Sequence, residues 1–314
     1  MGNTVLDFNK ILKECGVDSE PPDVVLNRIS SLDEFYTFDQ IVDIYNYILK
    51  NYINYDLLAG VIKLSDSHKS SSTMLILIDI LLKKCAKLED IDDYVNLRVL
   101  CIKAIANYKD TTTLNILLYC LNNKEENYKI RLTCADALGR IGDKYAVKPL
   151  IDVVKDENEK SIYVKESATF ALGLLGDISA IEPLVSIMEA KQGLWDKFSF
   201  LKEKIVEALG KLNINNTNVL KVFKSSLMDS SPMVRINTIE ALMNSEYDEA
   251  PELIRKALHD SDEEVQRNAL IALFNLQGED ILNEVISLPV YSKFLKEEAE
   301  YMLSEYVDNQ EEDD

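Results

Sequence analysis

From residue 94 onwards, apolar residues recur at helical spacing in blocks of similar length. Each block reads as two amphipathic helices, because apolar positions three and four residues apart share one face of an α-helix. The clearest copies are IRLTCADALGRIGDKYAVKPL, which begins at Ile130, and VKESATFALGLLGDISAIEPL, which begins at Val164. Two copies of one pattern, a single block apart, predict an array of repeated helix pairs.

Six blocks can be aligned on one alanine in the first helix of each pair. The aligned alanines are Ala104, Ala137, Ala171, Ala208, Ala241 and Ala272. They are separated by 33, 34, 37, 33 and 31 residues, which is typical of two-helix solenoid repeats. Six residues before each alanine stands a basic residue or, once, a glutamine: Arg98, Arg131, Lys165, Lys202, Arg235 and Gln266.

The aligned positions have physical reasons. The alanine must be small because the first helices of neighbouring pairs cross there, and overpacking such a contact costs about 1–3 kcal/mol. Glycines that follow it, such as Gly173 and Gly210, allow the same close approach. The Gly-Asp pairs at 142–143 and 176–177 are suited to end the first helix and cap the second, with glycine in the left-handed turn.

An aspartate follows the second helix in several pairs: Asp156, Asp229 and Asp260. We expect these carboxylates to pair with the recurring basic residue of the next helix pair. Such a ladder would fix the register between neighbouring pairs rather than bind a ligand.

The two ends of the chain depart from this repeat. Residues 1–93 are predicted to form irregular helical repeats, with helices at about 5–15, 23–31, 38–52, 54–65 and 71–87. Six repeats over 94–278 follow, and then capping helices over 279–307, apolar on one face and acidic on the other. Residues 308–314 are predicted to form an acidic, disordered tail.

Net charge narrows the range of partners. The 54 Asp and Glu residues exceed the 34 Lys and Arg residues by 20, and the sequence pI is about 4.6. A protein that binds duplex DNA needs a basic stripe to neutralise phosphates. We therefore expect neither nucleic acid nor an anionic membrane as a partner, and no apolar run approaches the roughly 20 residues that span a bilayer.

The cysteines show no metal or redox spacing. The five are Cys15, Cys85, Cys101, Cys120 and Cys134, and none forms a C-x-x-C pair. The N-terminal MGNTVLDF has no signal-peptide pattern. A cytoplasmic protein with buried, reduced thiols and no cofactor is expected.

The repeated blocks resemble HEAT-like repeats of the type named for the phycobilisome (PBS) lyases. That pattern of V-R, A-L-G, G-D and A-x-x-P-L is met by residues 130–150 and 164–184. The resemblance is strong over 130–188, looser over 94–129 and 200–276, and weak before residue 90. It implies an all-α, right-handed α-solenoid of two-helix repeats whose second helices line a concave face.

Several proteins with this repeat are enzymes, so their residues can be sought here. Deoxyhypusine hydroxylase carries His-Glu pairs at the start of repeat helices, which hold two irons. The matching pairs contain no histidine: Leu132-Thr133, Glu166-Ser167, Glu203-Lys204, Ile236-Asn237 and Arg267-Asn268. That activity is excluded. A HEAT-like DNA glycosylase is a remote alternative, since it needs a basic channel. A bilin-lyase-like role in chromophore attachment, or a chaperone role, stays open.

The second helices supply the candidate binding residues. Two columns are predicted to point outward from them: Asn115, Lys148, Glu182, Lys221 and Glu252, and Tyr119, Asp152, Ser186, Ser225 and Lys256. Neither column is a stack of like residues, and mixed charges with short polar side chains suit a groove for a protein or peptide. No catalytic set or phosphate loop is recognisable.

Aromatic residues give secondary candidates. Trp195 lies in the longest inter-repeat insertion, where an exposed tryptophan could anchor a partner. Tyr45 and Tyr47 belong to a helix that is apolar nearly all round, which favours burial but is also compatible with docking. The sequence thus favours a non-catalytic scaffold that binds a protein or peptide, with a basic surface on the partner, along its concave face.

Overall fold

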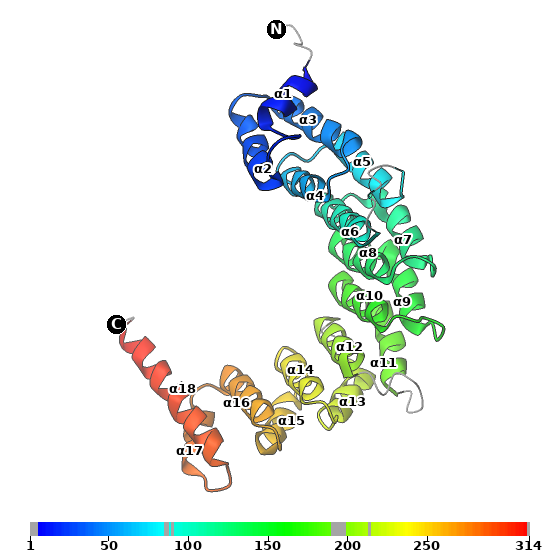
Figure 1. Ribbon diagram of the computed structural model, residues 1–314. Helices are drawn as coiled ribbons and strands as arrows, with labels where there is room; N and C mark the ends of the chain where they lie inside the picture. Colours follow the sequence, from blue (N-terminus) through cyan, green and yellow to red (C-terminus); the bar gives the residue numbers. More distant parts are fainter. Residues whose placement is uncertain (1–5, 85–87, 89–90, 190–198, 213–214, 313–314) are drawn as a thin grey trace. The chain divides into compact units, whose positions relative to one another are not determined.

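The computed structural model describes residues 6–84, 88, 91–189, 199–212 and 215–312. Within these residues every regular element is a helix, and successive helices stack in pairs (Figure 1). The chain divides into two compact parts, residues 1–146 (unit 1) and 147–314 (unit 2). This is the all-α solenoid predicted from the sequence, although the division falls inside the repeat array and not at residue 93.

Unit 1 contains eight helices among its described residues. They are α1 (Phe8–Cys15), α2 (Pro22–Ser30), α3 (Phe38–Asn51), α4 (Tyr55–Leu64), α5 (Ser71–Leu81), α6 (Ile91–Tyr108), α7 (Leu114–Asn122) and α8 (Tyr128–Ile141). The α3 helix is buried on most sides, with Ile41, Ile44 and Ile48 fully inaccessible to solvent. Burial of the 38–52 helix is thereby confirmed. The α5 helix ends at Leu81, earlier than predicted, because the chain turns at Lys83 with φ 63°.

Unit 2 continues the pairing through ten helices in its described residues. They are α9 (Val147–Lys155), α10 (Ile162–Leu175), α11 (Ile181–Glu189), α12 (Ser199–Leu212), α13 (Thr217–Ser226), α14 (Pro232–Met243), α15 (Ala250–Lys256), α16 (Glu263–Gln277), α17 (Asp280–Ser287) and α18 (Lys293–Glu312). We call α10, α12, α14 and α16 the inner row, and α9, α11, α13 and α15 the outer row.

The turns between paired helices form as their sequence predicts. The α10 helix ends at Gly176, whose φ of 63° is in the left-handed region that favours glycine. Asp177 then accepts a hydrogen bond from the main-chain N–H of Ser179 at 3.0 Å. Gly142, with φ 83°, ends α8 in the same way.

Small residues bring the inner-row helices close together. A Cβ atom on Gly173 of α10 would lie 3.1 Å from the Cα of Ala208 in α12, and one on Gly210 would lie 2.8 Å from the Cβ of Ala241 in α14. Inner-row helices pack against one another more extensively than outer-row helices do. The array therefore bends toward the row with the shorter spacing, as Figure 1 shows for unit 2.

The expectation that second helices line the concave face is wrong for unit 2. The alanine-bearing first helices form the inner side of its curve, and the second helices form the outer side. The cause lies in two crossings, Gly173 against Ala208 and Gly210 against Ala241, where small residues shorten the distance between first helices.

The recurring basic residue joins consecutive pairs through the main chain. The Nε of Arg131 donates to the carbonyl of Leu121 at 2.8 Å, and the Nζ of Lys165 donates to the carbonyl of Val154 at 2.8 Å. Arg98, Arg235 and Gln266 make the equivalent bond to Leu81, Asp229 and Asp260. Each bond satisfies a carbonyl at or just after the end of the preceding pair's second helix, where helical partners are missing.

The carboxylates of the ladder pair differently from the prediction. Asp260 binds both Nε and Nη2 of Arg235, at 2.8 and 2.7 Å, and Asp229 accepts from Lys202 at 2.9 Å. Each carboxylate thus pairs with the basic residue of its own helix pair, not of the next one. The next pair's residue takes the main-chain carbonyl instead: Arg235 takes that of Asp229, and Gln266 takes that of Asp260. The planar fork of Arg235 serves this carbonyl and the Asp260 carboxylate at once.

The last helix is longer than expected. The α18 helix runs to Glu312, so a helix occupies most of the segment for which a disordered tail was predicted from residue 308. The residues 308–312 are Asp, Asn, Gln, Glu and Glu, and glutamate and glutamine are compatible with a helix despite their charge or polarity. Across the described helices, none combines the length and apolarity that a membrane crossing requires.

Replacing Ala208 with leucine tests the close approach of the inner row. Ala208 is buried against α10, so Ala208→Leu is expected to lower the free energy of unfolding by about 1–3 kcal/mol through overpacking. Urea denaturation followed by circular dichroism measures the change. Lys221→Leu, at an exposed position of α13, is the control and should change stability by less than about 0.5 kcal/mol. Equal effects of the two substitutions would contradict the crossing argument.

Arg98 tests the join between helix pairs in unit 1. It is buried, its Nη2 lies 2.6 Å from Glu126, and its Nε serves the carbonyl of Leu81. Arg98→Ala deprives both acceptors of their buried donor and leaves Glu126 with the Asn127 amide and with Lys83 at 4.0 Å, so we expect a loss of about 3–5 kcal/mol at pH 7, measured by urea denaturation. Lys63→Ala, which removes an exposed cation of α4, should have little effect.

The stability lost in Arg98→Ala is expected to depend on pH. Burial raises the pKa of Glu126, but the Arg98 hydrogen bond, the Asn127 amide and the nearby cations outweigh it, and the pKa lies below its ordinary value. A carboxyl with a lowered pKa stabilises the fold above its unfolded pKa and loses that contribution as pH falls through the folded value. The difference between wild type and Arg98→Ala should therefore shrink below about pH 4. A constant difference would show that the ion pair contributes nothing.

Candidate functional site

The inner row presents one face of each alanine-bearing helix to solvent. The exposed positions lie five, four and one residues before the aligned alanine and three residues after it. In unit 2 they are Glu166, Ser167, Phe170 and Leu174 in α10; Glu203, Lys204, Glu207 and Lys211 in α12; Ile236, Asn237 and Glu240 in α14, with Asn244 directly after it; and Arg267, Asn268, Ile271 and Asn275 in α16. All sixteen are partly or fully exposed, and no position carries the same residue in all four copies.

A cavity of about 540 Å³ opens between α12 and α14 on this face. It is lined by Glu203, Lys204, Glu207, Gly210, Lys211, Met233, Asn237, Glu240, Ala241 and Asn244. Met233 is 50% exposed and provides apolar surface at one end. Gly210 and Ala241, which pack closely where the two helices cross, are part of its lining.

Two lysines are held rigidly beside the cavity. Glu207 accepts hydrogen bonds from Lys204 at 2.8 Å and from Lys211 at 2.6 Å. Both ammonium groups also lie over the ring of Phe170, at 5.4 and 4.6 Å from its centre. Burial raises the pKa of Glu207, but the two lysines outweigh it and keep the pKa below its ordinary value. The cluster is therefore charged and ordered without any ligand.

Two carboxylates in the same region are less well compensated. Glu166 is half-buried, and burial is the main reason that its pKa is raised. Lys204 lowers that pKa and Glu203 raises it again, with the net shift upward. Glu203 accepts a hydrogen bond from Ser231 at 3.4 Å. A cationic group that approached this pair would stabilise both carboxylates.

Side-chain amides continue the face over α14 and α16. Asn237 donates to the carbonyl of Glu203 at 3.5 Å, Asn244 to that of Glu240 at 3.0 Å, and Asn268 to that of Glu264 at 2.7 Å. Each bond uses one N–H and fixes the amide in place. The second N–H and the amide oxygen can then pair with the donor and acceptor of a peptide backbone.

The outward columns predicted from the sequence are all exposed, but they lie on the other side of unit 2. Lys148, Asp152, Glu182, Ser186, Lys221, Ser225, Glu252 and Lys256 belong to the outer row, and Asn115 and Tyr119 to α7 of unit 1. Lys256 lines a cavity of about 620 Å³ between α13 and α15, together with Met228 and His259. The other nine residues of the two columns do not line this cavity.

The aromatic residues predicted to bind a partner differ in exposure. Tyr45 is 1% exposed and packs edge-on against His68, with ring centres 5.7 Å apart. Burial raises the pKa of Tyr45 to about 12. It belongs to the core, so its assignment as a partner-binding residue is wrong. Tyr47 is half-buried and stacks on Phe8 at 4.6 Å, and Trp195 lies outside the described residues.

The described cysteines lie in the interior. Cys15, Cys101, Cys120 and Cys134 are buried, and none of these four forms a disulfide. In the described part of the chain, His, Cys, Asp and Glu form no group of three with the geometry to hold a metal ion.

The inner-row residues were missed as a binding surface for a specific reason. Four of the pairs inspected for iron ligands, at 166–167, 203–204, 236–237 and 267–268, occupy two of the four exposed positions on these helices. The presence or absence of histidine at these pairs decides only whether they can bind iron, and it does not show whether the side chains are exposed. Counting helical positions from the aligned alanine would have found the whole face, since positions −5, −4, −1 and +3 share one side of a helix.

Comparison with known proteins identifies the repeat. A profile of HEAT repeats matches residues 79–173 and 191–274, more than half of the chain, and a profile of the PBS lyase HEAT-like repeat matches residues 164–189. Among curated proteins, none matches the sequence.

Solved structures are similar in fold. Karyopherin Kap121p bound to the extreme C-terminus of the protein phosphatase Cdc14p is 12% identical, with a TM-score of 0.50 over 95% of this chain and 38% of that one. The complex of CpcE and CpcF of phycocyanin lyase from Nostoc sp. PCC7120 is 20% identical, with a TM-score of 0.47 over 75% and 96%. Human deoxyhypusine hydroxylase in complex with glycerol is 15% identical, with a TM-score of 0.37 over 88% and 99%. At these identities the likeness concerns the fold alone.

The electrostatics of the inner row can be tested by titrating Glu166. Because Glu203 raises its pKa and Lys204 lowers it, Glu203→Gln should lower the pKa of Glu166 and Lys204→Met should raise it. Carbon-13 NMR of the glutamate side-chain carboxyl measures both shifts. Glu252→Gln in the outer row serves as the control and should leave this pKa unchanged. Shifts in the opposite directions would contradict the described arrangement.

Proposed function

The chain belongs to the HEAT-repeat family, and from this premise we propose that it is a scaffold that binds a segment of another protein along the inner row of unit 2. An array in which each helix pair contacts its neighbours offers an extended surface rather than one deep pocket. Such a surface suits recognition of a protein or an extended peptide.

The observation that carries the proposal is the face that combines the α12–α14 cavity with the fixed amides of α14 and α16. Met233 offers apolar surface for a partner side chain at the cavity, and Asn237 and Asn244 stand beside it. A peptide backbone has one donor and one acceptor per residue, which matches the two kinds of group on an asparagine amide. The cavity would take a side chain while the amides hold the backbone.

The rigid charges beside the cavity support the same role. Lys204, Glu207 and Lys211 are already paired, so little side-chain freedom is lost when a partner binds. Opposite charges fixed in a defined pattern reject partners whose charges do not match, which supplies specificity more than affinity.

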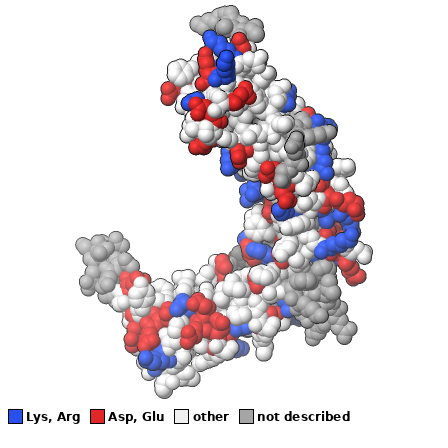
Figure 2. Space-filling view, viewed as in Figure 1, with Lys and Arg blue, Asp and Glu red and all other residues white. Residues whose placement is uncertain are grey.

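Excess carboxylate on the inner row favours a partner segment with basic residues. The cavity lining includes three glutamates and two lysines, and Glu166 adds a further carboxylate nearby. Further along unit 2, Figure 2 shows carboxylates gathered over α16 to α18, where Glu263, Glu264, Glu297 and Glu300 are exposed. A net charge of −20 would also steer a basic partner toward the chain and speed association at low salt.

Site-specific photo-crosslinking tests which row binds the partner. A photoreactive phenylalanine analogue is placed at Asn244 in the inner row or at Lys221 in the outer row, and the full chain is irradiated in extract of its source cells. We expect a crosslinked protein from position 244 and none from position 221, with a yield that falls as salt is raised. Mass spectrometry identifies the partner and the attached segment.

Comparison of the crosslinks from positions 244 and 221 shows which row binds the partner. Crosslinks from position 221 without any from position 244 would move binding to the outward columns of the outer row. Failure to crosslink at either position would contradict the scaffold role of unit 2. A crosslinked segment rich in acidic residues would contradict the electrostatic part of the proposal.

A further inference from the structure

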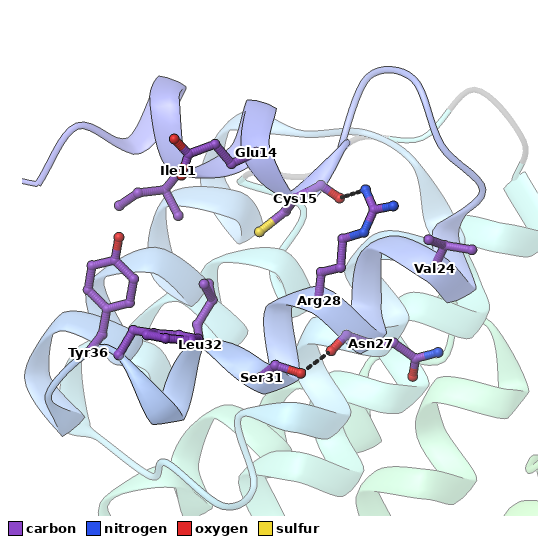
Figure 3. Close-up of a pocket in the computed structure, with 10 residues that line it drawn as sticks. Ile11, Glu14, Cys15, Val24, Asn27, Arg28, Ser31, Leu32 and Tyr36 are labelled. Carbon is purple, nitrogen blue, oxygen red and sulfur yellow. Dashed lines mark hydrogen bonds between the residues drawn. The ribbon is translucent and has the colours of Figure 1, made fainter.

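A further cavity, lined largely by apolar side chains, lies in the first helices of unit 1. Its volume is about 700 Å³, and it opens between α1, α2 and the short 3-10 helix η1 (Ser31–Glu34) that follows α2 (Figure 3). Ile11 and Cys15 are its buried apolar residues from α1, and Leu32, Phe35 and Tyr36 come from η1 and the turn after it. Unit 1 thus has a preformed site of its own, independent of the inner row of unit 2.

The exposed residues at this cavity are apolar, whereas the solvent-facing side of a helix is usually polar. Here Phe35 is 75% exposed and lines the cavity beside the half-buried Leu32 and Tyr36. Within the described residues no helix covers this side of the first pair. An exposed apolar cavity of this kind is typical of a docking site.

Charge around the cavity restricts its occupant. Residues 6–36 contain seven Asp and Glu against three Lys and Arg, a net charge of −4. The one cation in the lining, Arg28, is already engaged: its Nη1 donates to the carbonyl of Cys15 at 3.4 Å, and its Nη2 lies 3.5 Å from Glu20. Glu14, an exposed carboxylate, also lines the cavity. The lining itself thus holds one carboxylate and one cation, and the excess of carboxylates lies in the surrounding segment 6–36, which we call the acidic rim.

Two occupants from the same chain conflict with this charge. A second copy would bring another net charge of −20 toward an acidic rim. The C-terminal segment of the chain has no Lys or Arg after Lys296 and ends in Glu-Glu-Asp-Asp, so it would be repelled as well. A different protein with basic residues flanking its apolar ones fits both features.

We infer that this cavity docks a basic amphipathic helix of a partner protein, whose apolar side chains enter between α1 and η1. A helix is the expected form because the lining comes mainly from the helices α1, α2 and η1, and amphipathic helices bind such surfaces by burying their apolar face. Lysine or arginine on its flanks faces the acidic rim.

A designed peptide provides the test. The probe is a fluorescent helix of about 15 residues, made of leucine on one face and lysine elsewhere. Binding to the full chain is followed by fluorescence anisotropy. We expect Phe35→Ser to weaken binding about tenfold, since it removes apolar surface at the cavity without changing charge. Ile53→Ser removes an equally exposed apolar residue outside the cavity and should have little effect.

Peptide controls separate docking from general attraction to an acidic protein. A lysine-serine peptide of equal charge should bind about tenfold more weakly than the leucine-lysine helix, and a leucine-glutamate helix should bind more weakly still. Equal binding of Phe35→Ser and wild type would overturn the site, and equal binding of the leucine-glutamate helix would overturn the basic partner. Self-association of the chain that Phe35→Ser abolishes would assign the cavity to a second copy and overturn the inference.

Peptide binding at the unit 1 cavity can be tested independently of the proposed role of unit 2. Phe35→Ser should leave crosslinking from position 244 intact, and Met233→Ser in the inner row should leave binding of the leucine-lysine helix intact. Loss of both activities with either variant would indicate unfolding, which circular dichroism detects directly. A Phe35→Ser chain that keeps its helical signal yet loses the peptide supports the site.

Discussion

The close approach of the alanine-bearing helices is the constraint on which the rest of unit 2 depends. With Ala208 against Gly173 and Ala241 against Gly210, neighbouring first helices meet almost backbone to backbone. The second helices carry no such column of small residues and pack less closely. This difference in spacing sets the direction in which unit 2 curves, and Gly210 and Ala241 at one crossing also line the α12–α14 cavity. The same small residues therefore serve the scaffold and its candidate binding groove.

The buried basic residues fix the register between consecutive helix pairs, which packing alone does not do. Arg235 holds Asp260 at the end of its own helix pair and the carbonyl of Asp229 at the end of the preceding pair. A shift of one pair against the next would leave a buried guanidinium and a helix-end carbonyl without partners, and both are costly in a low-dielectric interior. Gln266 makes the carbonyl bond without carrying a charge, which shows that the hydrogen bond to the main chain is the shared part of the arrangement.

Features set by local spacing were predictable from the sequence, whereas features set by distances between helices were not. The repeat period, the glycine turns at Gly142 and Gly176, and the burial of α3 follow from helical periodicity and from backbone preference. The pairing of Asp229 with Lys202 required the distance across one helix pair, and the direction of curvature required the relative spacing of two rows. Tyr45 was ambiguous for a related reason: a helix that is apolar nearly all round does not reveal which of its faces meets the core.

Separation of scaffold and recognition also explains the acidity of the surface. Arg98, Arg131, Lys165 and Arg235 are buried, where carbonyls and carboxylates bind them, so these cations contribute little to the field outside the chain. The repeat thus places part of its positive charge in the interior while most glutamates and aspartates stay at the surface. Under the proposed scaffold role, recognition would depend on the positions where the repeats differ, since the shared positions are occupied by packing and register. A basic segment would be favoured there because the variable positions include carboxylates such as Glu166, whose pKa is raised by burial.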